Sequence, residues 1–181
     1  MRGVYAPDGS YNVTLVAAGG RKMSIVGNSP IILANSAVAA TAPANNTSEN
    51  ALATVTIPAN LMGANGTLRI TTQWSFTSSS NNKTLRIRLG GISGTVFRAA
   101  VFTTTVGFID LVLITNRNDL ASQLGGFSAS TSGGFGTSTS TAAVTATIDT
   151  SVDQDLVITG QKATGSETLV LERYMVEVIR G

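Results

Sequence analysis

Hydrophobic and polar residues alternate along much of this chain, most regularly between residues 66 and 91. Residues 67–76 place an apolar, aromatic or threonine side chain at every second position, and residues 84–89 repeat the pattern. A period of two is typical of a strand with one buried face. The intervening segment SSSNNK has the composition of a turn. We therefore predict a two-stranded hairpin from Gly66 to Gly91.

Three arginines occupy the polar positions of these two runs, namely Arg69, Arg86 and Arg88. If the runs pair as a hairpin, the arginines share one outward face. That face is either a solvated sheet surface or a contact between subunits, where arginine is enriched and can pair bidentately with carboxylates such as Glu172 or Glu177. The pattern leaves both interpretations open.

Apolar or alternating runs continue to the end of the chain with turn residues between them. Many short strands with regular turns are typical of an all-β fold, and we predict an antiparallel β-sandwich of jelly-roll type. The predicted strands are 51–57, 67–76, 84–89, 95–104, 107–115, 142–149, 155–160 and 167–179.

Two of these runs carry apolar residues on both faces. The segment 108–114 is almost continuously apolar, as expected for a strand that is buried on both sides, so Asp110 within it needs a partner. In the last run, 167–179, the apolar residues on both faces predict cover by the second sheet and by another chain.

The first 46 residues lack the long alternating runs of the rest of the chain. Residues 2–5 and 11–16 flank a Pro-Asp-Gly turn and predict a small β-hairpin, and the Ala-, Asn- and Thr-rich stretch that follows is typical of an extended linker. We predict an N-terminal arm at 1–35, a linker at 36–46 and a β-sandwich domain at 47–181. An isolated hairpin is marginally stable in water, so the arm needs a partner.

Composition narrows the function. Only 12% of residues are charged, which leaves little repulsion between copies and favours self-association. The sequence has no cysteine and no histidine, which removes thiolate sites and the commonest general base. Basic residues are scattered and aromatics are sparse, so nucleic acid is not an expected partner. We find no export signal and no apolar run long enough to span a membrane.

Two segments carry candidate chemistry. Asp149, Asp153 and Asp155 are close in sequence and could supply acid–base groups or calcium ligands, although aspartates before a strand ordinarily cap turns. The Gly- and Ser-rich stretch 125–141 carries Phe127 and Phe135. It is either a solvated loop or a tip that contacts a glycan or a neighbouring subunit. Neither segment predicts a cofactor.

The stretch TVTIPANLMGANGTLRITTQWSFTSSSNNKTLRIRLGG, residues 54–91, resembles a segment found in structural proteins of tailed bacteriophages. The likeness extends to residues 50–53 and 149–161 and covers most of 47–179. MRGVYAPDGSYNVTLV, residues 1–16, resembles a short element that precedes varied phage tail and fibre domains and looks like a docking tag. On this resemblance the docking residues are Val4, Tyr5, Pro7, Asp8, Gly9 and Tyr11.

The resemblance implies a non-enzymatic virion protein, a homotrimer assembled in the cytoplasm of the bacterial host. The leading role is a short tail fibre or receptor-binding appendage with a host surface glycan as ligand. The alternative is a head decoration protein that stabilises the capsid. A third hypothesis, a carbohydrate-active enzyme, would require catalysis by the three aspartates.

Overall fold

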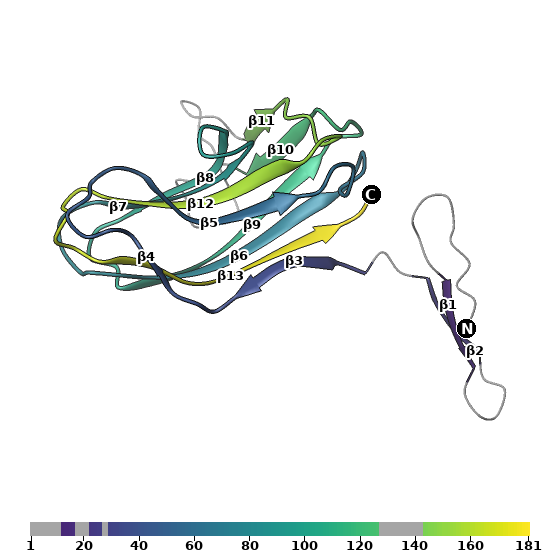
Figure 1. Ribbon diagram of the computed structural model, residues 1–181, viewed down its shortest axis with the longest axis horizontal. Helices are drawn as coiled ribbons and strands as arrows, with labels where there is room; N and C mark the ends of the chain where they lie inside the picture. Colours follow the sequence, from purple (N-terminus) through teal and green to yellow (C-terminus); the bar gives the residue numbers. More distant parts are fainter. Residues whose placement is uncertain (1–11, 17–21, 27–28, 127–142) are drawn as a thin grey trace. The chain divides into compact units, whose positions relative to one another are not determined.

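The computed structural model describes residues 12–16, 22–26, 29–126 and 143–181, and statements about structure refer to these residues (Figure 1). The chain divides into two compact units, Met1–Pro30 and Ile31–Gly181. In the first unit, β1 (Asn12–Val16) and β2 (Lys22–Val26) form an antiparallel pair. The strand predicted at 11–16 is therefore present and pairs with 22–26. The strand predicted at 2–5 lies outside the described residues.

The second unit consists of two antiparallel sheets, and its described residues contain no helix (Figure 1). The larger sheet has the order β11-β10-β9-β6-β13-β3, with β4 also paired to β13. The smaller sheet has the order β5-β12-β7-β8. The strands are β3 (Ile31–Ser36), β4 (Ala40–Thr41), β5 (Asn50–Ile57), β6 (Thr67–Phe76), β7 (Lys83–Leu89), β8 (Thr95–Phe102), β9 (Gly107–Asn116), β10 (Gln123–Gly126), β11 (Ala143–Ala146), β12 (Gln154–Lys162) and β13 (Leu169–Ile179).

The connections follow the jelly-roll path. If β3 and β4 count as one interrupted edge strand, the chain passes to the other sheet at most steps, and the exceptions are β7–β8 in the smaller sheet and β9–β10–β11 in the larger one. The larger sheet then contains the four-strand order β3-β13-β6-β9, facing β5-β12-β7-β8, and this is the arrangement of two Greek keys. The short pair β10–β11 extends the larger sheet beyond β9. The predicted all-β fold of jelly-roll type is confirmed.

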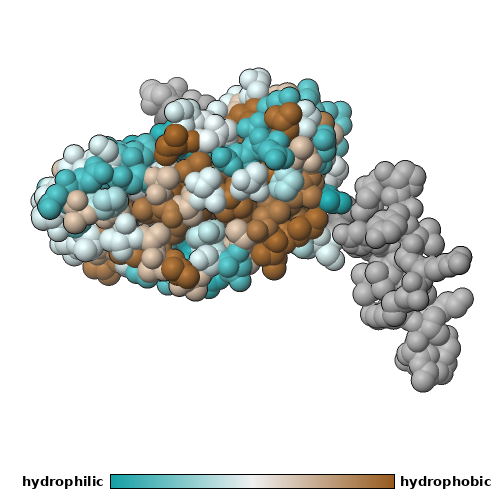
Figure 2. All heavy atoms as spheres, in the orientation of Figure 1, coloured by the Kyte–Doolittle hydropathy of each residue, from teal (hydrophilic) through white to brown (hydrophobic). Residues whose placement is uncertain are grey.

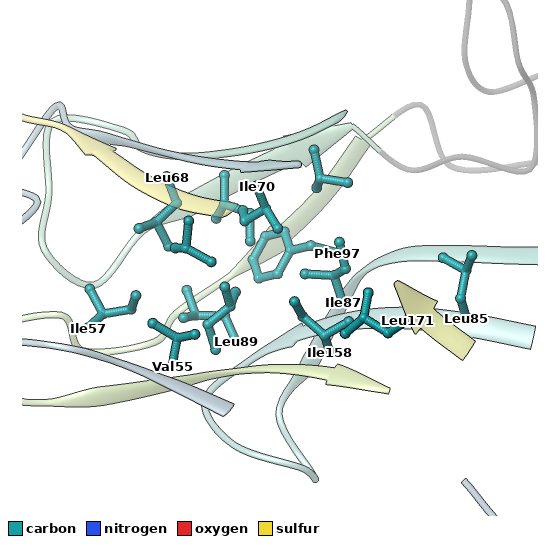
Figure 3. Packing of buried hydrophobic residues seen from close by; sticks show 14 of the residues in the cluster. Val55, Ile57, Leu68, Ile70, Leu85, Ile87, Leu89, Phe97, Ile158 and Leu171 are labelled. Carbon is teal, nitrogen blue, oxygen red and sulfur yellow. The ribbon is translucent and has the colours of Figure 1, made fainter. Parts of the chain in front are cut away.

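The core lies between the two sheets (Figure 3). Leu68 and Ile70 of β6 and Leu85, Ile87 and Leu89 of β7 are core residues between the sheets, and all five are fully buried. These are the apolar positions of the two alternating runs, so the period of two assigned the inner face correctly.

An aromatic row continues the core toward one end. Trp74 and Phe76 of β6 stack on each other, and Phe76 stacks on Phe102 of β8, which in turn contacts Phe108 of β9. The indole N–H of Trp74 donates to the Thr72 hydroxyl at 2.8 Å, which satisfies its polar group inside the core. The row joins the two sheets through direct ring contacts.

The predicted hairpin from Gly66 to Gly91 is wrong in its pairing. Strand β6 pairs with β13 and β9 in the larger sheet, whereas β7 pairs with β12 and β8 in the smaller one. The polar linker crosses between the sheets. Alternation identifies which face of a strand is buried, but it does not identify the neighbouring strand, and a short polar linker suits either connection.

The sandwich begins earlier in the chain than the predicted boundary. Strands β3 and β4 fall in the stretches predicted as the end of the arm and the linker, yet both pair with β13. They are short edge strands whose small residues, such as Ala34 and Ala40, pack against the core from its margin. Residues 31–46 therefore belong to the compact unit Ile31–Gly181.

Candidate functional site

The outer face of the smaller sheet carries a cluster around Glu49. Arg88 binds its carboxylate bidentately at 2.8 and 2.9 Å, and the Arg86 guanidinium lies 3.1 Å from it. The Thr159 hydroxyl donates to the same carboxylate at 2.5 Å. The hydrogen bond from Arg88 is the main cause that lowers the pKa of Glu49; burial opposes it, while Thr159 and the charge of Arg86 add to the lowering. Two arginines are thus engaged within the chain.

The lowered pKa of Glu49 predicts acid sensitivity. The unfolded chain takes up this proton at a higher pH than the folded chain, so the stabilisation is complete above the unfolded pKa of about 4.3 and is lost as pH falls below it. We expect the free energy of unfolding, measured by urea denaturation, to fall between about pH 5 and pH 3, and to fall less steeply in Glu49→Gln. An unchanged slope in that variant would show that the cluster does not contribute.

The third arginine lies on the other sheet. Arg69 of β6 binds Glu177 of β13 bidentately at 2.7 and 2.8 Å, and the two residues are direct cross-strand partners. Glu172 of β13 accepts a hydrogen bond from the Ser75 hydroxyl. The predicted single arginine face is therefore wrong, because Arg69 is on the larger sheet and Arg86 and Arg88 are on the smaller one. The predicted pairing of an arginine with Glu177 occurs, but within one chain.

Among the described residues, the outer face of β9 is apolar and exposed. Ile109, Leu111 and Leu113 alternate with buried residues and are 68%, 60% and 48% exposed. We call these three residues the β9 row. Val106, just before the strand, and Ile32 of β3 on the same sheet are also exposed, and Figure 2 shows apolar side chains at the surface over β3. Isolated exposed apolar residues are common on protein surfaces, whereas several that line up on one sheet face indicate a contact site for a partner.

Asp110 is buried in β9 and has the partner that the sequence required. Arg98 of β8 contacts it through Nε at 2.5 Å from Oδ2, so this ion pair joins the two sheets. The Arg98 guanidinium also lies 5.8 Å from the centre of the Phe108 ring. The pair lies beside the aromatic row and serves the structure of the sandwich.

Two buried lysines form a second charged cluster, which the sequence analysis missed. Lys83 of β7 and Lys162 of β12 are cross-strand partners, and both are fully buried. Lys162 Nζ donates to the carbonyls of Pro43, Gly165 and Glu167 at 2.9, 3.1 and 2.9 Å. One ammonium group thus ties two loops to the end of the smaller sheet.

Lys83 completes this cluster through a third loop. Its Nζ donates to the Ser79 hydroxyl at 2.9 Å and lies 3.8 Å from the Glu167 carboxylate. Asn81 donates to the same carboxylate at 3.0 Å. Hydrogen bonding from Ser79, followed by that from Asn81, lowers the pKa of Glu167. Lys83 lies two residues before Leu85, so the period of two places both on the buried face of β7. This spacing is the one sequence signal that could have indicated the burial of Lys83.

The three aspartates at the start of β12 and just before it act separately. Asp149 accepts from the backbone N–H of Ser151, Asp153 from the N–H of Ala59, and Asp155 from the Thr56 hydroxyl, at 2.8, 2.8 and 2.9 Å. The first two are turn and loop hydrogen bonds, and the third joins cross-strand partners on β12 and β5. Within the described ranges, no group of three acidic, histidine or cysteine residues is arranged to hold a metal ion.

Several predicted site residues lie outside the described residues. These are the docking residues Val4, Tyr5, Pro7, Asp8, Gly9 and Tyr11, and the two phenylalanines of the predicted contact loop, Phe127 and Phe135. In the part of the chain that the structure describes, no helix is long and apolar enough to cross a membrane.

The fold defines the class as an antiparallel jelly-roll sandwich. No protein-family model matches the chain, and no curated protein matches it. Among solved structures, the CBM2 module of the evolved Dit of Lactobacillus casei BL23 phage J-1 is 13% identical, with a TM-score of 0.34 over 71% of this chain and 69% of that one.

Two structures of infectious bursal disease virus, the Gx and Gt strains, are 10% and 15% identical, with TM-scores of 0.32 and 0.28. Each match covers 93% of this chain but only 46% or 47% of the viral chain, so the chain spans about half the length of those proteins. These likenesses are distant, and the jelly-roll description rests on the strand order.

Proposed function

We propose that this chain is a non-enzymatic structural protein of a tailed-phage virion, assembled as a homotrimer in the bacterial cytoplasm and joined to other virion proteins through its N-terminal arm. The observation that carries this proposal is the division into a small unit with a β-hairpin, Met1–Pro30, and a jelly-roll sandwich, Ile31–Gly181. A two-stranded unit needs a partner for stability. The resemblance of residues 1–16 and 54–91 to phage structural proteins supplies the context.

The roles of the carboxylates support a structural rather than a catalytic protein. Asp149, Asp153 and Asp155 accept hydrogen bonds from separate donors, and Asp110 and Glu177 are bound by arginines. An acid–base pair for glycoside hydrolysis needs two carboxylates that face one substrate. If replacing the three aspartates with asparagine abolished glycan cleavage and left glycan binding intact, the chain would be an enzyme.

The leading role is a short tail fibre or receptor-binding appendage. In this role the arm docks on the tail, the sandwich is a rigid support, and the segment carrying Phe127 and Phe135 contacts a glycan on the host surface. Loops on rigid β scaffolds are common recognition sites. The test is competition: purified protein should slow adsorption of the phage to its host, and Phe127→Ala with Phe135→Ala should remove this effect. Unchanged adsorption at saturating protein argues against the receptor role.

Head decoration is the second candidate, and the β9 row favours it. The row is an apolar sheet face, while Trp74, the one tryptophan of the chain, is buried in the core. An apolar face suits packing against a neighbouring subunit, as decoration requires, more than binding of a sugar, which commonly uses an exposed aromatic ring. Loss of capsid resistance to heat or osmotic shock in particles that lack the protein would support decoration.

Removal of residues 1–30 tests the docking role of the arm. The deletion ends before β3, so the sandwich keeps its edge strand. We expect the truncated protein to fold with an unchanged urea midpoint and to be absent from purified particles. A deletion of residues 1–41, which also removes β3 and β4, is the matched control and should destabilise the sandwich. Normal copy number of the 1–30 deletion in particles would overturn the docking role.

A further inference from the structure

The larger sheet leaves one strongly apolar strand half covered. The sequence of β9 has the almost continuous apolar character of a strand that is buried on both faces. Within the part of the chain that the structure describes, Val112 and Ile114 face the core and are buried, but the β9 row on the opposite side is exposed. An uncovered face of this kind indicates a missing partner.

The charges beside the β9 row indicate what kind of partner fits. The direct neighbours of Ile109, Leu111 and Leu113 on β6 are Gln73, Thr71 and Arg69. Gln73 and Thr71 are uncharged, and Arg69 is neutralised by its bidentate bond to Glu177. Farther from the row, β13 adds the exposed Arg173, the cross-strand neighbour of Gln73, and Glu172, which accepts a hydrogen bond from Ser75, and their charges are opposite. Identical surfaces repel when they carry net charge, and the charges on this face are balanced. The face can therefore meet another copy of itself without a penalty from net charge.

The size of the face is also adequate. Strands β6 and β9 have 10 residues each and β13 has 11. At about 3.3 Å per residue and about 4.8 Å between strands, four strands including β3 present a face of about 33 by 19 Å, on the order of 600 Å². Specific protein interfaces bury about 600–1,000 Å² on each partner. A second copy packed on this face would thus bury enough surface for a stable contact.

We propose that other copies of this chain cover the outer face of β9, with the β9 row of each copy packed along a shared rotation axis. Copies related by a rotation axis bring the same residues to that axis. A single apolar stripe along one strand can therefore pack against the same stripe of the other copies. The inference rests on the proposed self-association and adds its location. It also moves the interface from the arginines, which are bound within the chain, to the apolar strand.

Leu111→Lys in the full chain tests this location. Leu111 is 60% exposed, so the change leaves the fold intact, which an unchanged urea midpoint checks. Val101→Lys is the matched control, since Val101 is 56% exposed on the edge strand β8 of the other sheet. By light scattering, we expect the wild type and Val101→Lys to be oligomers. Leu111→Lys should need at least about tenfold higher concentration to assemble.

Cysteine cross-linking gives an independent readout, because the chain has no cysteine of its own. Leu111→Cys should form covalent dimers under mild oxidation, and Val101→Cys should not. A wild-type monomer would contradict both the homotrimer and this inference. An oligomer that Leu111→Lys leaves unchanged, or that cross-links only at Val101→Cys, would overturn the proposed location and leave the homotrimer standing.

Discussion

Replacing Asp110 with alanine should lower the free energy of unfolding by about 3–5 kcal/mol, the usual cost of removing one partner from a buried ion pair. Asp110 and Arg98 join β9 to β8, and both side chains are more than nine-tenths buried. The variant leaves the Arg98 charge in the interior without the Asp110 carboxylate, and it also leaves space beside the aromatic row. Urea denaturation at neutral pH measures the loss.

Two controls separate this effect from general sensitivity to mutation. Asp155→Ala removes an exposed carboxylate that accepts one hydroxyl hydrogen bond, and we expect a loss of about 1 kcal/mol or less. The double variant Arg98→Met with Asp110→Leu removes both charges, and it should recover most of the stability. If Asp110→Ala were no worse than Asp155→Ala, the ion pair would not be a major contributor to the link between the sheets.

Lys162→Met should be the second most damaging change, with a loss of about 3 kcal/mol. Methionine has a similar volume but no donor, so the Pro43 and Glu167 carbonyls lose the Lys162 bond. The bond to Glu167 is buried, and a buried acceptor left unsatisfied costs about 1–3 kcal/mol, whereas the exposed Pro43 costs less because water can reach its carbonyl. The carbonyl of Gly165 keeps a bond from the backbone N–H of Asn45. Part of the loss is offset because methionine has no charge to desolvate.

Arg117→Met is the control for Lys162→Met. Arg117 is exposed in the loop that follows β9, and its replacement should change stability by less than about 0.5 kcal/mol. Hydrogen exchange provides a second readout, since Lys162 binds carbonyls in the segments around residues 43 and 165–167. We expect faster exchange in those segments in Lys162→Met. Equal stability of the two variants would show that the lysine is replaceable.

Much of the fold could be predicted because strand residues alternate with a period of two. The strand predicted at 67–76 has the observed bounds of β6, and the bounds of β5, β7, β9 and β12 differ by at most two residues at either end. The inner-face side chains of these strands are buried or half-buried, so the alternation of apolar and polar residues shows which face points inward. Strands β3 and β4 have only 6 and 2 residues and carry a weaker alternation, and they were therefore assigned to the arm and the linker.

Strand pairing could not be predicted in the same way. The partners of β6 are β9 and β13, about 40 and 100 residues further along the chain, and no local pattern encodes such contacts. Because the pairing was assigned wrongly, the three arginines were placed on one face. Arg86 and Arg88 share Glu49 as a partner, and this acidic residue lies before β5, where a hairpin centred on β6 and β7 gave no reason to look for it.

The buried charges were predictable in part. Asp110 stands out in an apolar run, and the prediction that it needs a partner is confirmed by Arg98. The identity of that partner depends on the packing of β8 against β9, which lie in different sheets. Lys83 and Lys162 occupy inward positions by phase, but lysine is so rarely buried that the alternation alone was not sufficient to assign them.

The most direct test of the virion assignment is gold-labelled antibody imaging of purified particles of the phage that encodes this chain. The account predicts label on intact particles, at the tail for the leading role. Label over the head would support decoration instead and would make capsid stability the next measurement. Particles that carry no label, with the protein found only in the lysate, would contradict the virion assignment.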